Sequence, residues 1–179
     1  MAISANIIII ILELIGLSLS AKRRGWRIFV FYTQLSNMVS LLSSVCFLLA
    51  GEKAAWLRYV STCMLTMTFV VTLLILVPMG AGFKKMMLTG SGLYHHTLCP
   101  ILSVASYLLW ERHAFSWLIP VVFTFLYGMV MLYLNGKGVV DGPYPFFRVR
   151  QQSAFATVVW MAALTGVITL IAFAVIWIT

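Results

Sequence analysis

Long apolar runs, separated by short joints that hold most of the charged residues, constrain this chain more than any other feature. A membrane-spanning α-helix needs about 20 mainly apolar residues. By that measure the sequence predicts spans at residues 3–20, 27–50, 56–79, 91–110, 115–135 and 153–178. The runs lack the alternating pattern of outer-membrane β-strands. We therefore expect an all-α polytopic membrane protein, a bundle of six transmembrane helices in which residues 1–179 form one domain.

The composition agrees with lipid as the surrounding solvent. Hydrophobic residues make up 63% of the chain and charged residues 9%, against about 45–50% and about 25% in globular proteins. The net charge is +8, but the basic residues flank the apolar runs, which suits lipid headgroups and not nucleic acid. Cys46, Cys63 and Cys99 all lie inside apolar runs, and this odd number predicts neither a disulfide framework nor a zinc site.

The distribution of basic residues predicts the orientation in the membrane. The joints after the first, third and fifth runs, with their edges, hold Lys22, Arg23, Arg24, Arg27, Lys84, Lys85, Lys137, Arg148 and Arg150. The other joints hold Lys53, Arg58 and Arg112. Basic joints face the cytoplasm, so we expect the odd-numbered joints inside and both termini outside. Since the first basic cluster follows its apolar run, we interpret that run as an uncleaved helix and not as a signal peptide.

Several polar residues lie inside the predicted spans. Glu13 is acidic and in the middle of the first, where a carboxyl is costly unless it faces the bundle. Glu13 has either a structural role, in which it hydrogen-bonds to a neighbouring helix, or a functional role, in which it orients a catalytic group or relays a proton. One face of the second run carries Thr33, Ser36, Asn37, Ser40 and Ser44, and one face of the third carries Ser61, Thr68 and Thr72. Such residues join helices by hydrogen bonds or line a water path.

Two further segments are candidates for function. His95 and His96 are adjacent, so their side chains point about 100° apart on a helix and cannot share one partner. The sequence offers no further metal ligand at their depth, so we predict no metal, and either histidine is a candidate general base. Tyr144, Pro145 and Phe146 form a stiff aromatic joint before the last run. This joint is either a passive loop in the headgroup layer or a wall that contacts lipid.

Counting the rise of about 1.5 Å per residue along each helix places these groups at a similar depth. If the second helix begins near Trp26, Thr33 lies about 10 Å deep, and the two histidines lie about 6–8 Å deep. Glu13 reaches a similar level. We therefore predict that Thr33 faces His95 or His96 across a cavity that opens toward the odd-numbered joints.

The same residues carry a resemblance to a known family. The chain contains Trp26-Arg27 and Phe31-Tyr32-Thr33, then a His-Thr pair before Pro100, and finally Tyr144-Pro145-Phe146. This order resembles that of the androgen-induced and androgen-dependent TFPI-regulating proteins and their bacterial six-helix relatives. The family consists of multipass threonine hydrolases that cleave fatty acid esters of hydroxy fatty acids with a threonine nucleophile and a histidine.

The resemblance implies Thr33 as the nucleophile. The resemblance leaves two candidates for the histidine. Counting five positions back from Pro100 gives His95. Counting four positions back, or matching the His-Thr pair, gives His96, which is the residue that we favour. The animal members have an acidic residue three positions after the threonine, where this chain has Ser36. The remaining site residues would be Glu13, Ser36 or Asn37 to orient the histidine, and Tyr144, Pro145 and Phe146 to bind substrate.

Two functions remain open from the sequence. The first is an intramembrane lipid ester hydrolase without a cofactor, which acts on a membrane lipid or fatty acyl ester in a bacterial cytoplasmic membrane. The alternative is a non-enzymatic membrane scaffold or a small-solute transporter. No G-x-S-x-G motif is present in the sequence, which excludes the common serine esterase fold.

Overall fold

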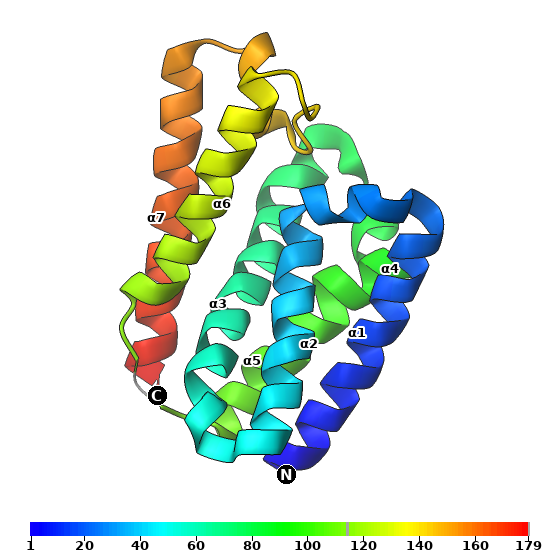
Figure 1. Ribbon diagram of the computed structural model, residues 1–179, viewed down its shortest axis with the longest axis vertical. Helices are drawn as coiled ribbons and strands as arrows, with labels where there is room; N and C mark the ends of the chain where they lie inside the picture. The colour runs from blue at the N-terminus through cyan, green and yellow to red at the C-terminus, as the bar shows by residue number, and fades with distance from the viewer. Residues whose placement is uncertain (114, 179) are drawn as a thin grey trace.

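A computed structural model describes residues 1–113 and 115–178 (Figure 1). Ala114 and Thr179 lie outside the described residues, so the predicted joint from Glu111 to Ala114 is followed only to His113. Throughout the described ranges the regular structure is helical, with no strand. The prediction of an all-α fold is confirmed.

The helical elements follow from the apolar runs. In chain order they are α1 (Ala2–Arg24), η1 (Gly25–Val30), α2 (Tyr32–Ala50), η2 (Gly51–Ala54), α3 (Ala55–Val71), η3 (Thr72–Ala81), η4 (Lys84–Leu88), α4 (Gly90–Leu93), η5 (Tyr94–Leu98), α5 (Cys99–Trp110), α6 (Leu118–Gly136), η6 (Pro145–Phe147), η7 (Val149–Gln151) and α7 (Ala154–Ile178). The elements η3, η4 and η5 are π-helical, and the other η elements are 3-10 helices.

Four helical stretches are long and apolar enough to cross a membrane. They are Ala2–Val30, Tyr32–Ala81, Leu118–Gly136 and Ala154–Ile178. The second is 50 residues long and turns back at η2, so it contains both α2 and α3. Among the described residues, Gly90–Trp110 is not one of these stretches. The chain is therefore an all-α membrane protein, and the count of six spans stays a prediction.

The segment before α2 differs from the prediction. We expected one helix over residues 27–50, but Phe31 has extended backbone angles (φ −91°, ψ 129°) and separates η1 from α2. Gly25, at φ 54°, ends α1, and η1 then crosses the end of the bundle (Figure 1). Trp26 and Phe29 on η1 are exposed, as befits aromatic residues at a membrane interface. The prediction of a continuous helix is wrong, and Thr33 lies in the first turn of α2.

The helices form two packed groups. One group contains α1, α2, α3 and α5, and the pair α6–α7 packs against α3 (Figure 1). The joints that follow α1, η3 and α6 lie at the same end of the molecule (Figure 1). The first group has a polar interior, whose buried side chains include Asn6, Glu13, Ser20, Ser36, Asn37, Ser40, Ser43, Ser44, Arg58, Ser61, Thr62, Thr68, Thr72, Ser103 and Ser106. Small hydroxyl residues of this kind commonly join helices in membranes.

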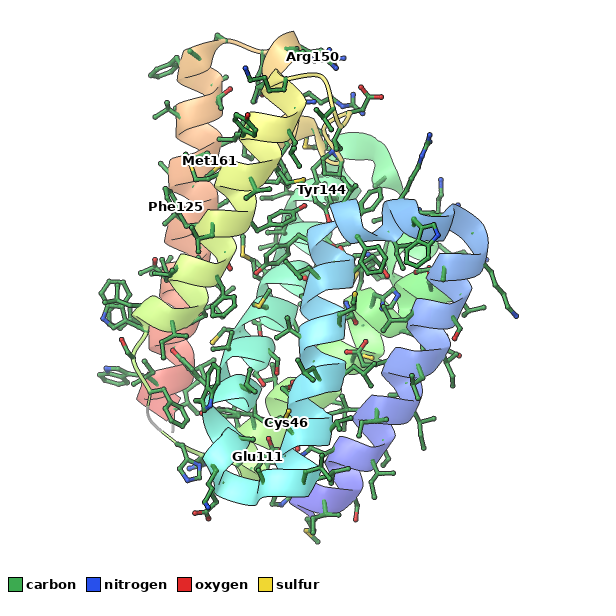
Figure 2. The ribbon with its side chains drawn as sticks, in the orientation of Figure 1. Cys46, Glu111, Phe125, Tyr144, Arg150 and Met161 are labelled. Atoms are coloured by element: carbon green, nitrogen blue, oxygen red, sulfur yellow. The ribbon has the colours of Figure 1, made fainter. Side chains whose placement is uncertain are left out.

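An ion pair inside the first group was not expected. We counted Arg58 with the edge of a joint, and Glu111 begins the predicted joint at 111–114; both side chains are nevertheless fully buried, and Arg58 Nε donates to Glu111 Oε2 at 2.8 Å. Arg58 also donates to Ser44 at 3.3 Å, and Glu111 Oε1 accepts from Asn6 Nδ2 at 2.7 Å. Glu111 and Tyr144 lie at opposite ends of the molecule (Figure 2). The pair thus joins α3 to the residue after α5 at the end of the molecule farther from Tyr144.

Candidate active site

Thr33 owes its surroundings to the helix start at Tyr32. Backbone N–H groups in the first turn of a helix have no acceptor within that helix. The Thr33 N–H donates to the Tyr144 hydroxyl at 3.2 Å, and Thr33 Oγ1 lies 3.2 Å from the same oxygen. Tyr144, distant in sequence, therefore contacts both the backbone N–H and the hydroxyl of Thr33.

The segment around Tyr144 points into the protein. Tyr144 is extended (φ −130°, ψ 155°), and Pro145 then begins the short helix η6. The Tyr144 ring stacks on Phe146 at 5.1 Å between centroids, and Phe146 packs on Trp160 of α7. The aromatic side chains are buried in the protein, and the choice between a passive loop and a wall that contacts lipid stays a prediction. Burial raises the pKa of Tyr144, and its hydroxyl therefore remains protonated at neutral pH.

Two cavities meet at Thr33. The first, which we call the apolar cavity, lies between α2, α3, α6, α7 and η6. The second has a more polar lining than the first, and we call it the polar cavity; its walls include Arg24, Gln34 and His96. Thr33, Leu76 and Tyr144 line both cavities. The Thr33 side chain is thus on the wall that they share.

His96 shares the polar cavity with Thr33. Its Nδ1 lies 2.9 Å from Thr72 Oγ1, which comes from the start of η3. Among the described residues, neither His95 nor His96 is hydrogen-bonded to Thr33. The structure therefore brings Thr33 and His96 to one cavity. There the Thr33 hydroxyl contacts Tyr144, and His96 Nδ1 contacts Thr72.

His95 points away from the two cavities, toward α1. Its Nε2 is 3.0 Å from Ser20 Oγ, and its Nδ1 is 3.9 Å from Glu13 Oε2. Gly16 makes room for the ring, because a Cβ atom there would lie 2.7 Å from His95 Cε1. The prediction that the adjacent histidines have different partners is confirmed, and Glu13 lies near His95.

The other polar residues of α2 support the backbone at Thr33. Asn37 Nδ2 donates to the Thr33 carbonyl oxygen at 2.6 Å, and Ser36 Oγ donates to the same oxygen at 3.0 Å. Ser36 Oγ also lies 2.9 Å from Thr68 Oγ1. In the part of the chain that the structure describes, neither Ser36 nor Asn37 bonds to a histidine. Both residues therefore fix the turn that carries Thr33.

Sequence reasoning missed the partner of His96. The spacing placed Thr72 on a polar face of the third run, but no sequence signal connects that face to a histidine 24 positions later. Arg24 was counted as a topology signal, yet it lines the polar cavity. Both roles depend on how distant segments pack.

Comparison of the chain with family models, curated proteins and solved structures finds no match in any of the three. Fold and site together define an all-α membrane protein with adjoining apolar and polar cavities. The resemblance to threonine hydrolases rests on the sequence motifs alone.

Proposed function

We propose that this protein is an intramembrane lipid ester hydrolase, in which Thr33 is the nucleophile and His96 is the general base. The observation that carries the proposal is the position of Thr33 on the wall shared by the apolar and polar cavities. A fatty acyl ester has the same division, because a long apolar chain is joined through its carbonyl to a more polar part. A chain bound in the apolar cavity would bring its ester group to Thr33.

The reaction would proceed by acyl transfer to threonine. A hydroxyl is a weak nucleophile and needs a base within hydrogen-bond reach. As Thr33 Oγ1 leaves its contact with Tyr144 and attacks the carbonyl carbon, His96 accepts its proton. The ester C–O bond then breaks and the alcohol departs with that proton. Water, deprotonated by His96, attacks the acyl-threonine; the bond from the acyl carbon to Thr33 Oγ1 breaks, the acid leaves, and Oγ1 regains the proton from His96.

The negative charge on the carbonyl oxygen needs hydrogen-bond donors. The Thr33 N–H lies in the first turn of α2, where the helix dipole is positive. The Tyr144 hydroxyl lies beside it at 3.2 Å, and its raised pKa keeps it a donor. We assign these two groups to the oxyanion, a role in which one donor contributes about 10²–10³ in kcat.

The substrate-binding residues expected from the sequence keep that role in the proposal. Phe146 lines the apolar cavity, Pro145 lines the polar cavity, and Tyr144 lines both. Phe146 would contact the acyl chain, whereas Pro145 would contact the part of the substrate beyond the ester. The bilayer supplies such esters directly to a site between helices.

Labelling by a fluorophosphonate probe tests the proposal. Thr33 Oγ1 would displace fluoride from phosphorus, so purified wild-type protein should be labelled at Thr33 and should hydrolyse long-chain esters. Thr33→Ala should lose both, whereas Thr66→Ala should keep both, because the Thr66 hydroxyl bonds only within its own helix, to Thr62. Equal labelling of wild type and Thr33→Ala would refute the assignment.

One observation favours the alternative of a small-solute transporter. The buried polar side chains of α1, α2, α3 and α5 extend along the group, from Asn6 and Glu111 toward Ser20 and His95. A transporter would need such a lining. Solute or proton uptake by proteoliposomes, without ester hydrolysis or probe labelling, would favour this function.

A further inference from the structure

A hydrogen bond joins Thr72 to His96. Both side chains are buried, and 2.9 Å separates Thr72 Oγ1 from His96 Nδ1. Thr72 is the first residue of η3 and His96 lies within η5, and both segments are π-helical. Such segments are rare and often occur at functional sites. The two irregular segments thus meet at this one bond.

The bond determines what the other ring nitrogen can do. In a neutral imidazole one nitrogen carries the proton and the other accepts, and a partner at one nitrogen fixes the state of the other. Because Nδ1 is held by Thr72, Nε2 is the nitrogen left for chemistry. Within the described residues no hydrogen bond joins Nε2 to the protein.

The surroundings favour an unprotonated Nε2. His96 lines the polar cavity together with Arg24. The Arg24 guanidinium lies over the Phe31 ring of the same cavity wall, 4.3 Å from the ring centroid. Its positive charge favours a lone pair over an N–H on a ring nitrogen that faces this cavity, and a guanidinium offers no acceptor to such an N–H. Nδ1 then carries the proton, and Thr72 Oγ1 accepts it as a hydrogen bond.

We infer that Thr72 is a positioning residue, whose hydroxyl holds His96 with Nδ1 protonated and with the Nε2 lone pair available to the polar cavity. The inference deepens the proposed function and rests on it, because a base at Nε2 is what the Thr33 reaction needs. Thr72 lines the apolar cavity but not the polar one, whereas Thr33 lines both. Thr33 therefore remains the attacking group.

Histidine ¹⁵N NMR tests the tautomer without any substrate. The protein, labelled at histidine and held in detergent, is compared as wild type, Thr72→Ser, Thr72→Val and Thr66→Val. His95→Gln and His113→Gln assign the His96 signals by elimination. We expect protonated Nδ1 and unprotonated Nε2 in wild type, Thr72→Ser and Thr66→Val, and a shift toward protonated Nε2 in Thr72→Val. Protonated Nε2 in the wild type, or no change in Thr72→Val, would overturn the inference.

Ester hydrolysis tests the consequence. Thr72→Val should lower kcat by a factor within the about 10²–10⁴ that a general base contributes, with a smaller change in KM. Thr72→Ser should restore most of kcat, and Thr66→Val should match wild type. Full kcat in Thr72→Val would contradict the inference.

The two proposals fail in different ways. If wild type hydrolyses no ester and takes up no probe, the proposed function fails, while the NMR result still decides whether Thr72 fixes the tautomer. If the probe attaches to Thr72 and Thr33→Ala remains active, Thr72 is itself the nucleophile and the positioning role is refuted.

Discussion

Removal of Arg58 should destabilise the fold strongly. In Arg58→Met the side chain keeps much of its apolar length, but the Glu111 carboxylate loses its positive partner while it stays fully buried. Asn6 and Ser106 remain as hydrogen-bond donors to Glu111, but neither carries charge. Breaking a buried ion pair by removal of one partner costs about 3–5 kcal/mol.

The expected change is large enough for thermal unfolding. For chains of this size, 1 kcal/mol shifts Tm by about 2–4 °C, so Arg58→Met should lower Tm by about 6–20 °C. The readout is the loss of helical circular dichroism in detergent micelles. Arg112→Met is the matched control, because Arg112 is exposed and bonds to the Leu108 backbone of the preceding helix α5. Surface changes usually stay within about 0.5 kcal/mol.

The double variant Arg58→Met/Glu111→Gln identifies the cause. A glutamine carries no charge, and its side-chain oxygen still accepts from Asn6 Nδ2, so the double variant should lose less stability than the two single variants added together. If Arg58→Met unfolds at the wild-type temperature, or if the two single losses simply add, the pair does not stabilise the bundle as the structure indicates.

Three further predictions address the site and the orientation. Tyr144→Phe keeps the ring stack but removes a donor, so kcat for a long-chain ester should fall about 10²–10³-fold. Tyr107→Phe should keep its rate, because the Tyr107 hydroxyl donates to the His113 carbonyl and Tyr107 lines neither cavity; equal rates in the two variants would exclude Tyr144 from the oxyanion. Glu13→Gln should keep the fold and most activity, because Glu13 lies beside His95 and not His96; a variant as inactive as Thr33→Ala would make Glu13 a participant. Cysteines placed at 84 and 85 should resist an impermeant thiol reagent in intact cells while one at 53 reacts, and the opposite pattern would invert the predicted topology.

The all-α class could be predicted from the sequence, because the chain consists of long apolar runs with short joints. The sequence also predicted that Thr33 and Tyr144 lie near His95 or His96, and the structure places Thr33, His96 and Tyr144 on the polar cavity. It did not predict the break at Phe31, since residues 27–50 contain neither proline nor glycine to mark it.

Charged residues near the ends of the runs were a second source of error. Arg58 and Glu111 each lie within a few residues of a predicted joint, and from the sequence such residues are indistinguishable from water-exposed ones. Their burial depends on partners far along the chain, such as Asn6 and Ser44. The same reason explains why Thr72 was not connected to His96.

The break at Phe31 bears directly on the chemistry that we propose. In the interior of a helix the Thr33 N–H would donate to the carbonyl four residues earlier and would not be free for a substrate. Because α2 begins at Tyr32, this N–H instead reaches Tyr144, and an incoming carbonyl oxygen can replace the tyrosine oxygen as its acceptor. A threonine seven residues inside a straight helix would have its hydroxyl but no backbone donor beside it. The helix start that the apolar pattern concealed is therefore what allows one residue to supply both the nucleophile and a donor for the oxyanion.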